Sequence, residues 1–214
     1  MGVAASGDPR FFLTLINDRL YAEIRRPGVR FVYNDRKTAQ AAAYVVALNG
    51  GRLNYMVLIK LLYLSDRRSL LEIGTPITGD RMVSMPHGPV LSRTLDQINM
   101  GRPISGTSPW YEYLTEPAGY EVSLASILEE TDELSNYERR VLRETFEEFG
   151  NMNKWSLRDF THTLPEWHDP AGSSRPIDPV DILRYAGVPD ATISELVSDA
   201  EEMWFVEELA TISS

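Results

Sequence analysis

The side chains best suited to acid–base or metal chemistry in this sequence are its three histidines. His87 lies in a Pro-His-Gly-Pro turn, and His162 and His168 stand on either side of Glu166. Two histidines at this spacing do not share a helix face, and a proline between them interrupts a helix. A metal site of His162, Glu166 and His168 would also need a fourth ligand and supporting hydrogen bonds, which the sequence does not supply. We expect no metal site, and we expect His162 to bond to the backbone at a helix end.

Nucleophilic and phosphate-binding motifs are missing from the sequence. It contains no cysteine and no Gly-x-Ser-x-Gly segment, which excludes thiol catalysis and the common serine-hydrolase turn. Gly50 and Gly51 lack the lysine of a phosphate-binding loop and are better explained as the end of a helix. Three acidic pairs lie in charged helical stretches and are expected to be solvated: Glu129-Glu130, Glu147-Glu148 and Glu201-Glu202. The sequence therefore predicts no catalytic residue and no cofactor.

Charge is distributed unevenly along the chain. Residues 1–110 hold 14 Lys and Arg against 8 Asp and Glu, whereas residues 111–214 hold 7 against 23, so the net charge of −10 comes from the second half. Such an acidic surface is explained either by solubility or by attraction of a basic partner. The absence of cysteine fits a reducing cytoplasm, and no apolar run is long enough to cross a membrane. We expect a cytoplasmic protein without a membrane segment.

Apolar residues at three- and four-residue spacing predict helices along most of the chain. Asn54 is expected to cap one of them, and Ser135 and Glu138 form a capping box at the start of another. Asp178 and Pro179 have the types that favour a helix start. The predicted helices cover residues 8–26, 35–48, 54–74, 89–100, 135–150, 156–163 and 178–187, and a last one begins at 190.

The period of the sequence changes in the middle of the chain. Arg81 to Met85 alternates as a short strand does, and Pro89 is then expected to begin a helix. Trp110 to Leu114 and Tyr120 to Leu124 alternate on either side of a Glu-Pro-Ala-Gly turn, which predicts a β-hairpin. The predicted fold class is α+β, predominantly α-helical, with a small antiparallel β-sheet or hairpin in the middle of the chain.

The chain divides into three predicted parts. Residues 1–34 form an amphipathic N-terminal helix extension, residues 35–170 the main domain, and residues 171–214 a linker followed by acidic C-terminal helices. The second boundary follows from a stretch rich in proline, glycine and serine between residues 169 and 179.

One run of the sequence has several features in a characteristic order. Between Lys60 and Ile98 a leucine-rich helix bearing Tyr63 and Asp66 is followed by a Gly-x-Pro-Ile-Thr-Gly-Asp turn, a short strand and a Gly-Pro-Val sequence. Further on come the segments Trp155-Ser156-Leu157 and Thr161-His162, and then Trp167. In order and spacing these features resemble the Panacea domain, the family of SocA-like antitoxins and phage-associated GepA-like proteins. The resemblance covers roughly residues 35–170, the main domain.

The resemblance implies an antitoxin that is not an enzyme and that neutralises a cognate toxin by direct protein–protein binding. Its motif residues are expected to build the scaffold: glycine permits tight backbone turns, and Asp66 can cap a turn or pair with an arginine. The motif residues are Asp66, Gly79, Asp80, His87, Gly88, Pro89, Thr161, His162 and Trp167. Two alternatives stay open. One is an adaptor that delivers a client to a protease or chaperone, and the other is an unrecognised metal-dependent hydrolase that uses the histidines.

Candidate partner contacts lie outside the resemblance. The N-terminal apolar stripe includes Phe11, Phe12 and Leu15, and the acidic tail carries Trp204 and Phe205, large side chains typical of interfaces. Packing of the stripe on the core would explain it equally well. Basic residues near the N-terminus attract phosphates, but the acidic second half repels DNA, so nucleic acid is expected only as a weak operator contact.

Overall fold

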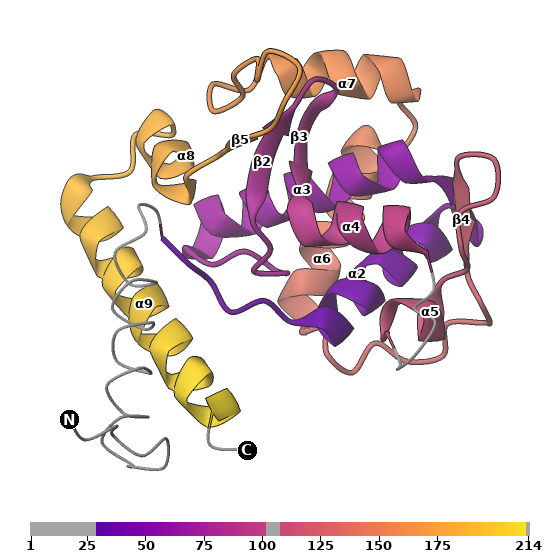
Figure 1. Cartoon of the computed structure of the whole chain (residues 1–214), viewed down its shortest axis with the longest axis horizontal. Helices are drawn as coiled ribbons and strands as arrows, with labels where there is room; N and C mark the ends of the chain where they lie inside the picture. The colour runs from indigo at the N-terminus through magenta and orange to yellow at the C-terminus, as the bar shows by residue number, and fades with distance from the viewer. Residues whose placement is uncertain (1–28, 102–107, 213–214) are drawn as a thin grey trace, which may run out of the picture.

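The computed structural model describes residues 29–101 and 108–212 (Figure 1). Within these ranges the chain forms eight helices and two small antiparallel sheets, which confirms the predicted α+β class with its predominance of helix. No helix in these ranges combines the length and apolar character needed to cross a bilayer. The helix predicted over residues 8–26, with Phe11, Phe12 and Leu15, lies outside the described residues.

Helix α3 (Tyr55–Ile73) is the central element of the fold. Asn54 caps its first turn by accepting a hydrogen bond from the backbone N–H of Met56, and Gly74 ends it in the left-handed conformation, as the sequence predicts. Its side chains from Val57 to Asp66 are all buried. A helix that is buried on nearly all sides has to be surrounded by other elements, and the rest of the fold supplies them.

Helices α2 (Asp35–Leu48) and α6 (Asn136–Phe149) pack against α3. The buried face of α2 consists mainly of small side chains, which lets its neighbours approach closely: Ala39, Ala41, Ala42 and Ala43, all fully buried. In α6 the capping box of Ser135 and Glu138 is present as predicted, and Val141 and Leu142 are buried. These three helices enclose the main hydrophobic core.

The larger sheet is formed by β2 (Met82–Met85), β3 (Gly88–Leu91) and β5 (Arg175–Pro176), in the order β3-β2-β5. The strand predicted over Arg81 to Met85 is confirmed. The helix start predicted at Pro89 is wrong, because Pro89 lies in β3 opposite Ser84 and the next helix, α4 (Ser92–Met100), begins later. β3 is an edge strand, where the missing N–H of a proline is tolerated.

The hairpin predicted between Trp110 and Leu124 is wrong in its first arm. Residues Trp110–Tyr113 form the single helical turn α5, whose spacing places Trp110 and Leu114 together in the core. The second arm contains β4 (Glu121–Ser123), which pairs with β1 (Arg52–Asn54) in a two-stranded sheet. Between the two predicted arms, the structure has a single antiparallel β-bridge, which links Leu114 and Leu124.

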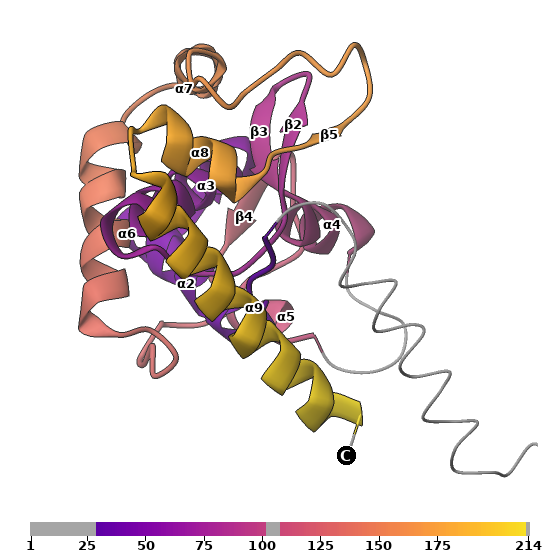
Figure 2. The ribbon, with the colours of Figure 1, turned by 90° about the vertical axis from the view of Figure 1, so that its left-hand side faces the viewer.

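Three further helices complete the described chain. Helix α7 (Lys154–His162) lies beside the turn of the β2–β3 hairpin in both views of the ribbon (Figures 1 and 2). Asp178 caps α8 (Pro179–Tyr185), as predicted, and α9 (Asp190–Ile212) packs on α8 at the periphery.

The predicted boundary at residue 170 stays a prediction. Beyond it, β5 joins the sheet of β2 and β3, and Ile177, Ile182 and Leu183 belong to the same hydrophobic core as α3.

Candidate functional site

The motif residues gather in two places, and the first is the loop between α3 and β2. Asp66 accepts hydrogen bonds from the backbone N–H groups of Ile77 and Thr78, at 3.1 and 3.0 Å, and from the Thr78 hydroxyl at 2.5 Å. Burial raises the pKa of Asp66 to about 7, although the hydrogen bonds of Thr78 act in the opposite direction. This carboxyl holds the loop onto α3, in line with the expected role of capping a turn.

Gly79 and Asp80 fix the end of the same loop. Gly79 has a φ of +69°, and a Cβ there would lie 2.0 Å from the carbonyl oxygen of Val32, so a side chain cannot fit. Asp80 accepts from the backbone N–H groups of Arg93 and Thr94, at 3.0 and 2.8 Å, and thereby caps α4. The first group of motif residues therefore holds the loop between α3 and β2 and the start of α4 in place.

The second group lies where the β2–β3 hairpin meets α7 (Figure 1). Gly88 has a φ of +90°, and a Cβ there would lie 2.6 Å from the Thr161 hydroxyl oxygen and 2.9 Å from Lys60 Nζ. The Lys60 ammonium group is buried and donates to the carbonyl oxygen of Pro89 at 2.6 Å. Burial lowers the pKa of Lys60 to about 7. A buried lysine of α3 thus binds the β2–β3 hairpin to that helix through a hydrogen bond.

His162 and Trp167 stack face to face beside Lys60, with ring centres 3.9 Å apart and planes 8° from parallel. Trp167 Nε1 donates to the carbonyl oxygen of Met85 at 3.2 Å, which joins the stacked pair to the hairpin. His162 Nε2 is buried and has no hydrogen-bond partner among the described residues, so the expected backbone bond is absent there. Burial lowers the pKa of His162, and the charges of Lys60 and Arg158 lower it further.

The carboxylate of Glu166 accepts hydrogen bonds from two side chains of α3. Its Oε1 accepts from the Tyr63 hydroxyl at 2.8 Å and from Arg67 Nε at 2.7 Å, in a setting where Glu166 is 4% exposed. His168 Nδ1 lies 3.2 Å from the Glu166 carbonyl oxygen. Within residues 29–101 and 108–212, no group of three His, Asp or Glu side chains is arranged to hold a metal ion, and His162, Glu166 and His168 do not form one.

The surface above this buried group is aromatic and basic. His87 lies exposed at the turn of the hairpin, with its ring 6.5 Å from that of Trp155 in an edge-to-face arrangement. Trp155 is 47% exposed and lies between Lys154 and Arg158, whose charged groups are both 5.0 Å from its ring centre.

Residues 58–168, more than half of the 214-residue chain, match the family described as "Antitoxin SocA-like, Panacea domain". The chain belongs to this SocA-like Panacea family. No curated protein and no solved structure matches the chain. The matched Panacea segment contains all nine motif residues but not helix α2, to which the resemblance in the sequence also extended.

The partner-contact candidates lie outside the Panacea match, and only those of the tail are described. Trp204 on α9 is half-buried beneath the guanidinium group of Arg30, 4.7 Å from its ring centre, and Phe205 is 38% exposed. Phe11, Phe12 and Leu15 lie outside the described residues.

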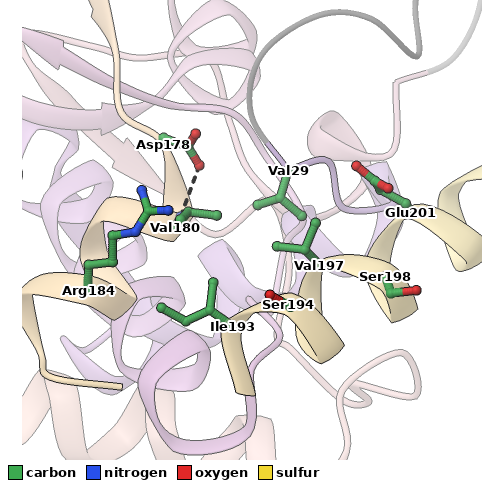
Figure 3. Close-up of a pocket in the computed structure, with 9 residues that line it drawn as sticks. All are labelled: Val29, Asp178, Val180, Arg184, Ile193, Ser194, Val197, Ser198 and Glu201. Carbon is green, nitrogen blue, oxygen red and sulfur yellow. Dashed lines mark hydrogen bonds between the residues drawn. The ribbon is translucent and has the colours of Figure 1, made fainter. Parts of the chain in front are cut away.

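A cavity of about 490 Å³ lies between α8 and α9 (Figure 3). Val29, Val180, Ile193 and Val197 turn their apolar side chains into it, and Asp178, Arg184 and Glu201 stand around them. None of the Panacea motif residues lines this cavity.

Sequence reasoning named Tyr63 and Glu166 but did not predict that they contact each other and Arg67. It did not identify Lys60 as part of this site. The signal for Lys60 was its place within the apolar run Val57–Leu64, because a cation there cannot reach solvent and needs a buried acceptor. Nothing in the local sequence of Arg67 indicates its partner, which is 99 residues further along the chain.

Proposed function

We propose that this protein is the antitoxin of a toxin–antitoxin system and neutralises its toxin by direct binding in the cytoplasm. The observation that carries the proposal is the match of residues 58–168 to the SocA-like Panacea family. The buried contacts of the motif residues support a binding role. The motif residues Asp66 and Asp80 use their carboxyl oxygens for backbone hydrogen bonds that hold the fold together, and Glu166, which is not a motif residue, does the same through side-chain bonds.

Helix α9 offers one candidate contact with the toxin. Met203, Phe205 and Val206 are 63%, 38% and 59% exposed, which leaves apolar side chains on the surface of a helix that also carries Glu201 and Glu202. Apolar anchors within a charged rim are typical of protein–protein contacts. The N-terminal stripe with Phe11, Phe12 and Leu15 is the other candidate from the sequence.

Co-expression tests the proposal directly. The protein encoded beside this one is expressed alone and together with the full chain, and growth is measured. We expect growth to stop with the neighbour alone and to recover with both, and the two purified proteins to elute as one complex. A neighbour that is harmless alone, or growth that does not recover, would contradict the antitoxin role.

The amount of neighbour protein in the rescued cells separates neutralisation from delivery to a protease. Binding alone leaves the toxin present in the complex at an undiminished level. Rescue accompanied by disappearance of the toxin, and dependent on a cellular protease, would identify an adaptor in place of a neutraliser.

A further inference from the structure

Five side chains form one surface strip over α7, the turn of the β2–β3 hairpin and the turn before β4. We call this strip the Trp155 patch; it consists of His87, Tyr120, Lys154, Trp155 and Arg158. Lys154 Nζ lies 5.4 Å from the ring centre of Tyr120 and 5.0 Å from that of Trp155. Aromatic rings and cations thus alternate along the patch, and each ring holds a neighbouring cation in place.

Tyr120 is placed in the patch by an unfavourable backbone conformation. Its φ is 74°, in the left-handed region, which costs a non-glycine residue roughly 1–2 kcal/mol. Its carbonyl oxygen accepts from the backbone N–H of Tyr55 at 3.0 Å, which fixes the turn. The side chain is 65% exposed, so burial does little to offset the strain. A two-residue hairpin turn between Ala118 and Glu121 requires positive φ at both Gly119 and Tyr120, so the turn explains the strain and holds Tyr120 at the surface.

The patch is a basic area on an acidic protein. Arg158 pairs with Asp159, and the nearby Glu121 pairs with Arg52, whereas Lys154 forms no ion pair with any carboxylate of the described chain. Lys60, Arg158 and His87 all lower the pKa of His162 beneath the patch, after the effect of burial itself, and Asp159 opposes them. The patch therefore carries the positive charge of Lys154 without a paired carboxylate among the described residues, while the whole chain carries a net charge of −10.

We propose that the Trp155 patch binds an acidic segment of the partner protein. The identity of that partner as the toxin rests on the proposed function, whereas the chemistry of the patch does not. A carboxylate from the partner would give Lys154 the ion pair that it lacks. Trp155 and Tyr120 would be covered at the same time, and Trp, Tyr and Arg are the residues that contribute most to binding at interfaces. The acidic remainder of the molecule would repel such a segment, so the segment would bind at the patch and not elsewhere on the surface.

An acidic protein segment fits the patch better than a single-stranded nucleic acid. The charged groups of Lys154 and Arg158 already lie against the indole of Trp155, where a base would have to stack. The net charge of −10 also opposes a long phosphate backbone, which would extend beyond the patch.

Tryptophan fluorescence of the full chain tests the patch without knowledge of the toxin. Trp155 is far more exposed than Trp110, which is 2% exposed, so a ligand on the patch changes the emission. The probes are a short peptide of glutamate, serine and leucine and a thymidine oligonucleotide of equal charge. We expect the peptide to bind more tightly than the oligonucleotide, with an affinity that falls as salt is added.

Lys154→Glu is the test variant, and Arg143→Glu at an exposed position of α6 is a control with the same change of net charge. An acidic side chain in the first turn of α7 is favourable to the helix, so the fold is retained. We expect peptide affinity to fall about tenfold or more in Lys154→Glu and to stay within about twofold in Arg143→Glu. Equal affinity of the two variants, no peptide binding, or tighter binding of the oligonucleotide would each overturn the inference.

The two proposals fail in different ways. If the wild-type chain binds the peptide but does not rescue cells from the neighbouring protein, the antitoxin role fails and the patch stands. If it rescues cells and Lys154→Glu rescues equally well with unchanged peptide affinity, the patch fails and the antitoxin role stands.

Discussion

The carboxylate of Asp80 accepts a hydrogen bond from the backbone N–H of Thr94 at 2.8 Å and so caps a helix to which it does not belong. It also accepts from the Thr94 hydroxyl at 2.8 Å. Leu91, the residue at the N-cap position of α4, has no side-chain oxygen to do this. The start of α4 therefore depends on a residue from before the β2–β3 hairpin, which couples hairpin and helix.

Replacement of Asp80 by alanine is expected to lower the free energy of unfolding by about 1–3 kcal/mol, because buried N–H groups lose their acceptor. Urea denaturation measures the change. Asp96→Ala, at an exposed position of the same helix, is the matched control and is expected to change stability by less than about 0.5 kcal/mol. Similar losses in both variants would show that the capping bond contributes nothing specific.

Gly88→Ala and Gly119→Ala separate backbone strain from lack of space. Both glycines have positive φ, +90° and +60°, but a Cβ at Gly119 would meet no atom within 4 Å, whereas one at Gly88 would meet Thr161 and Lys60. We expect Gly119→Ala to cost about 1 kcal/mol and Gly88→Ala at least 1 kcal/mol more. Thermal unfolding of the two variants gives the comparison, and equal losses would contradict the close contact of hairpin and α7.

Tyr63→Phe and Glu166→Gln test whether Glu166 serves structure. The first removes the buried hydroxyl that donates to Glu166, and the second removes the charge that faces Arg67. Each is expected to lower stability by about 1–3 kcal/mol. The double variant is expected to lose less than the sum of the two, since the side chains share one network. Strict additivity in chemical denaturation would contradict that network.

The lowered pKa of Lys60 predicts that the free energy of unfolding rises with pH. Its pKa is about 7 in the folded protein and 10.5 in an exposed lysine, so between these values the unfolded chain binds more protons than the folded one. The free energy of unfolding contributed by Lys60 is therefore lowest and constant below about pH 7 and increases above it. Lys60→Gln keeps a donor for Pro89 and does not titrate. Denaturation between pH 7 and 9.5 should show a smaller slope in the variant, and equal slopes would contradict the buried position of the ammonium group.

Three helix starts were predictable from sequence because a local side chain forms the cap. Asn54, Ser135 and Asp178 each accept from a backbone N–H two or three residues later, so type and spacing are sufficient to identify them. Pro89 shows the limit of such signals. A proline suits the start of a helix and an edge strand equally, and the pairing of β3 with β2, which the local sequence does not contain, decides between them.

The candidate site was predictable in its members but not in its arrangement. The order of Gly88, Thr161, His162 and Trp167 in the sequence identified the family residues, and the structure brings them to one place. Tyr120 and Trp155 join their surroundings through contacts between distant segments, and periodicity within one segment carries no information on these. The alternation of Trp110 to Leu114 misled for the same reason, because Trp110 and Leu114 are also one helical turn apart.

The position of β5 bears on how members of this family can be recombined. β5 lies after the matched segment, yet it covers the edge of β2, and α2 lies before that segment, yet its alanines cover α3. A graft of residues 58–168 alone would carry an unpaired strand edge and a bare helix face, both of which promote aggregation. Exchange of partner specificity between relatives is therefore expected to work by replacing surface residues within an intact chain, and to fail by transplanting the family segment.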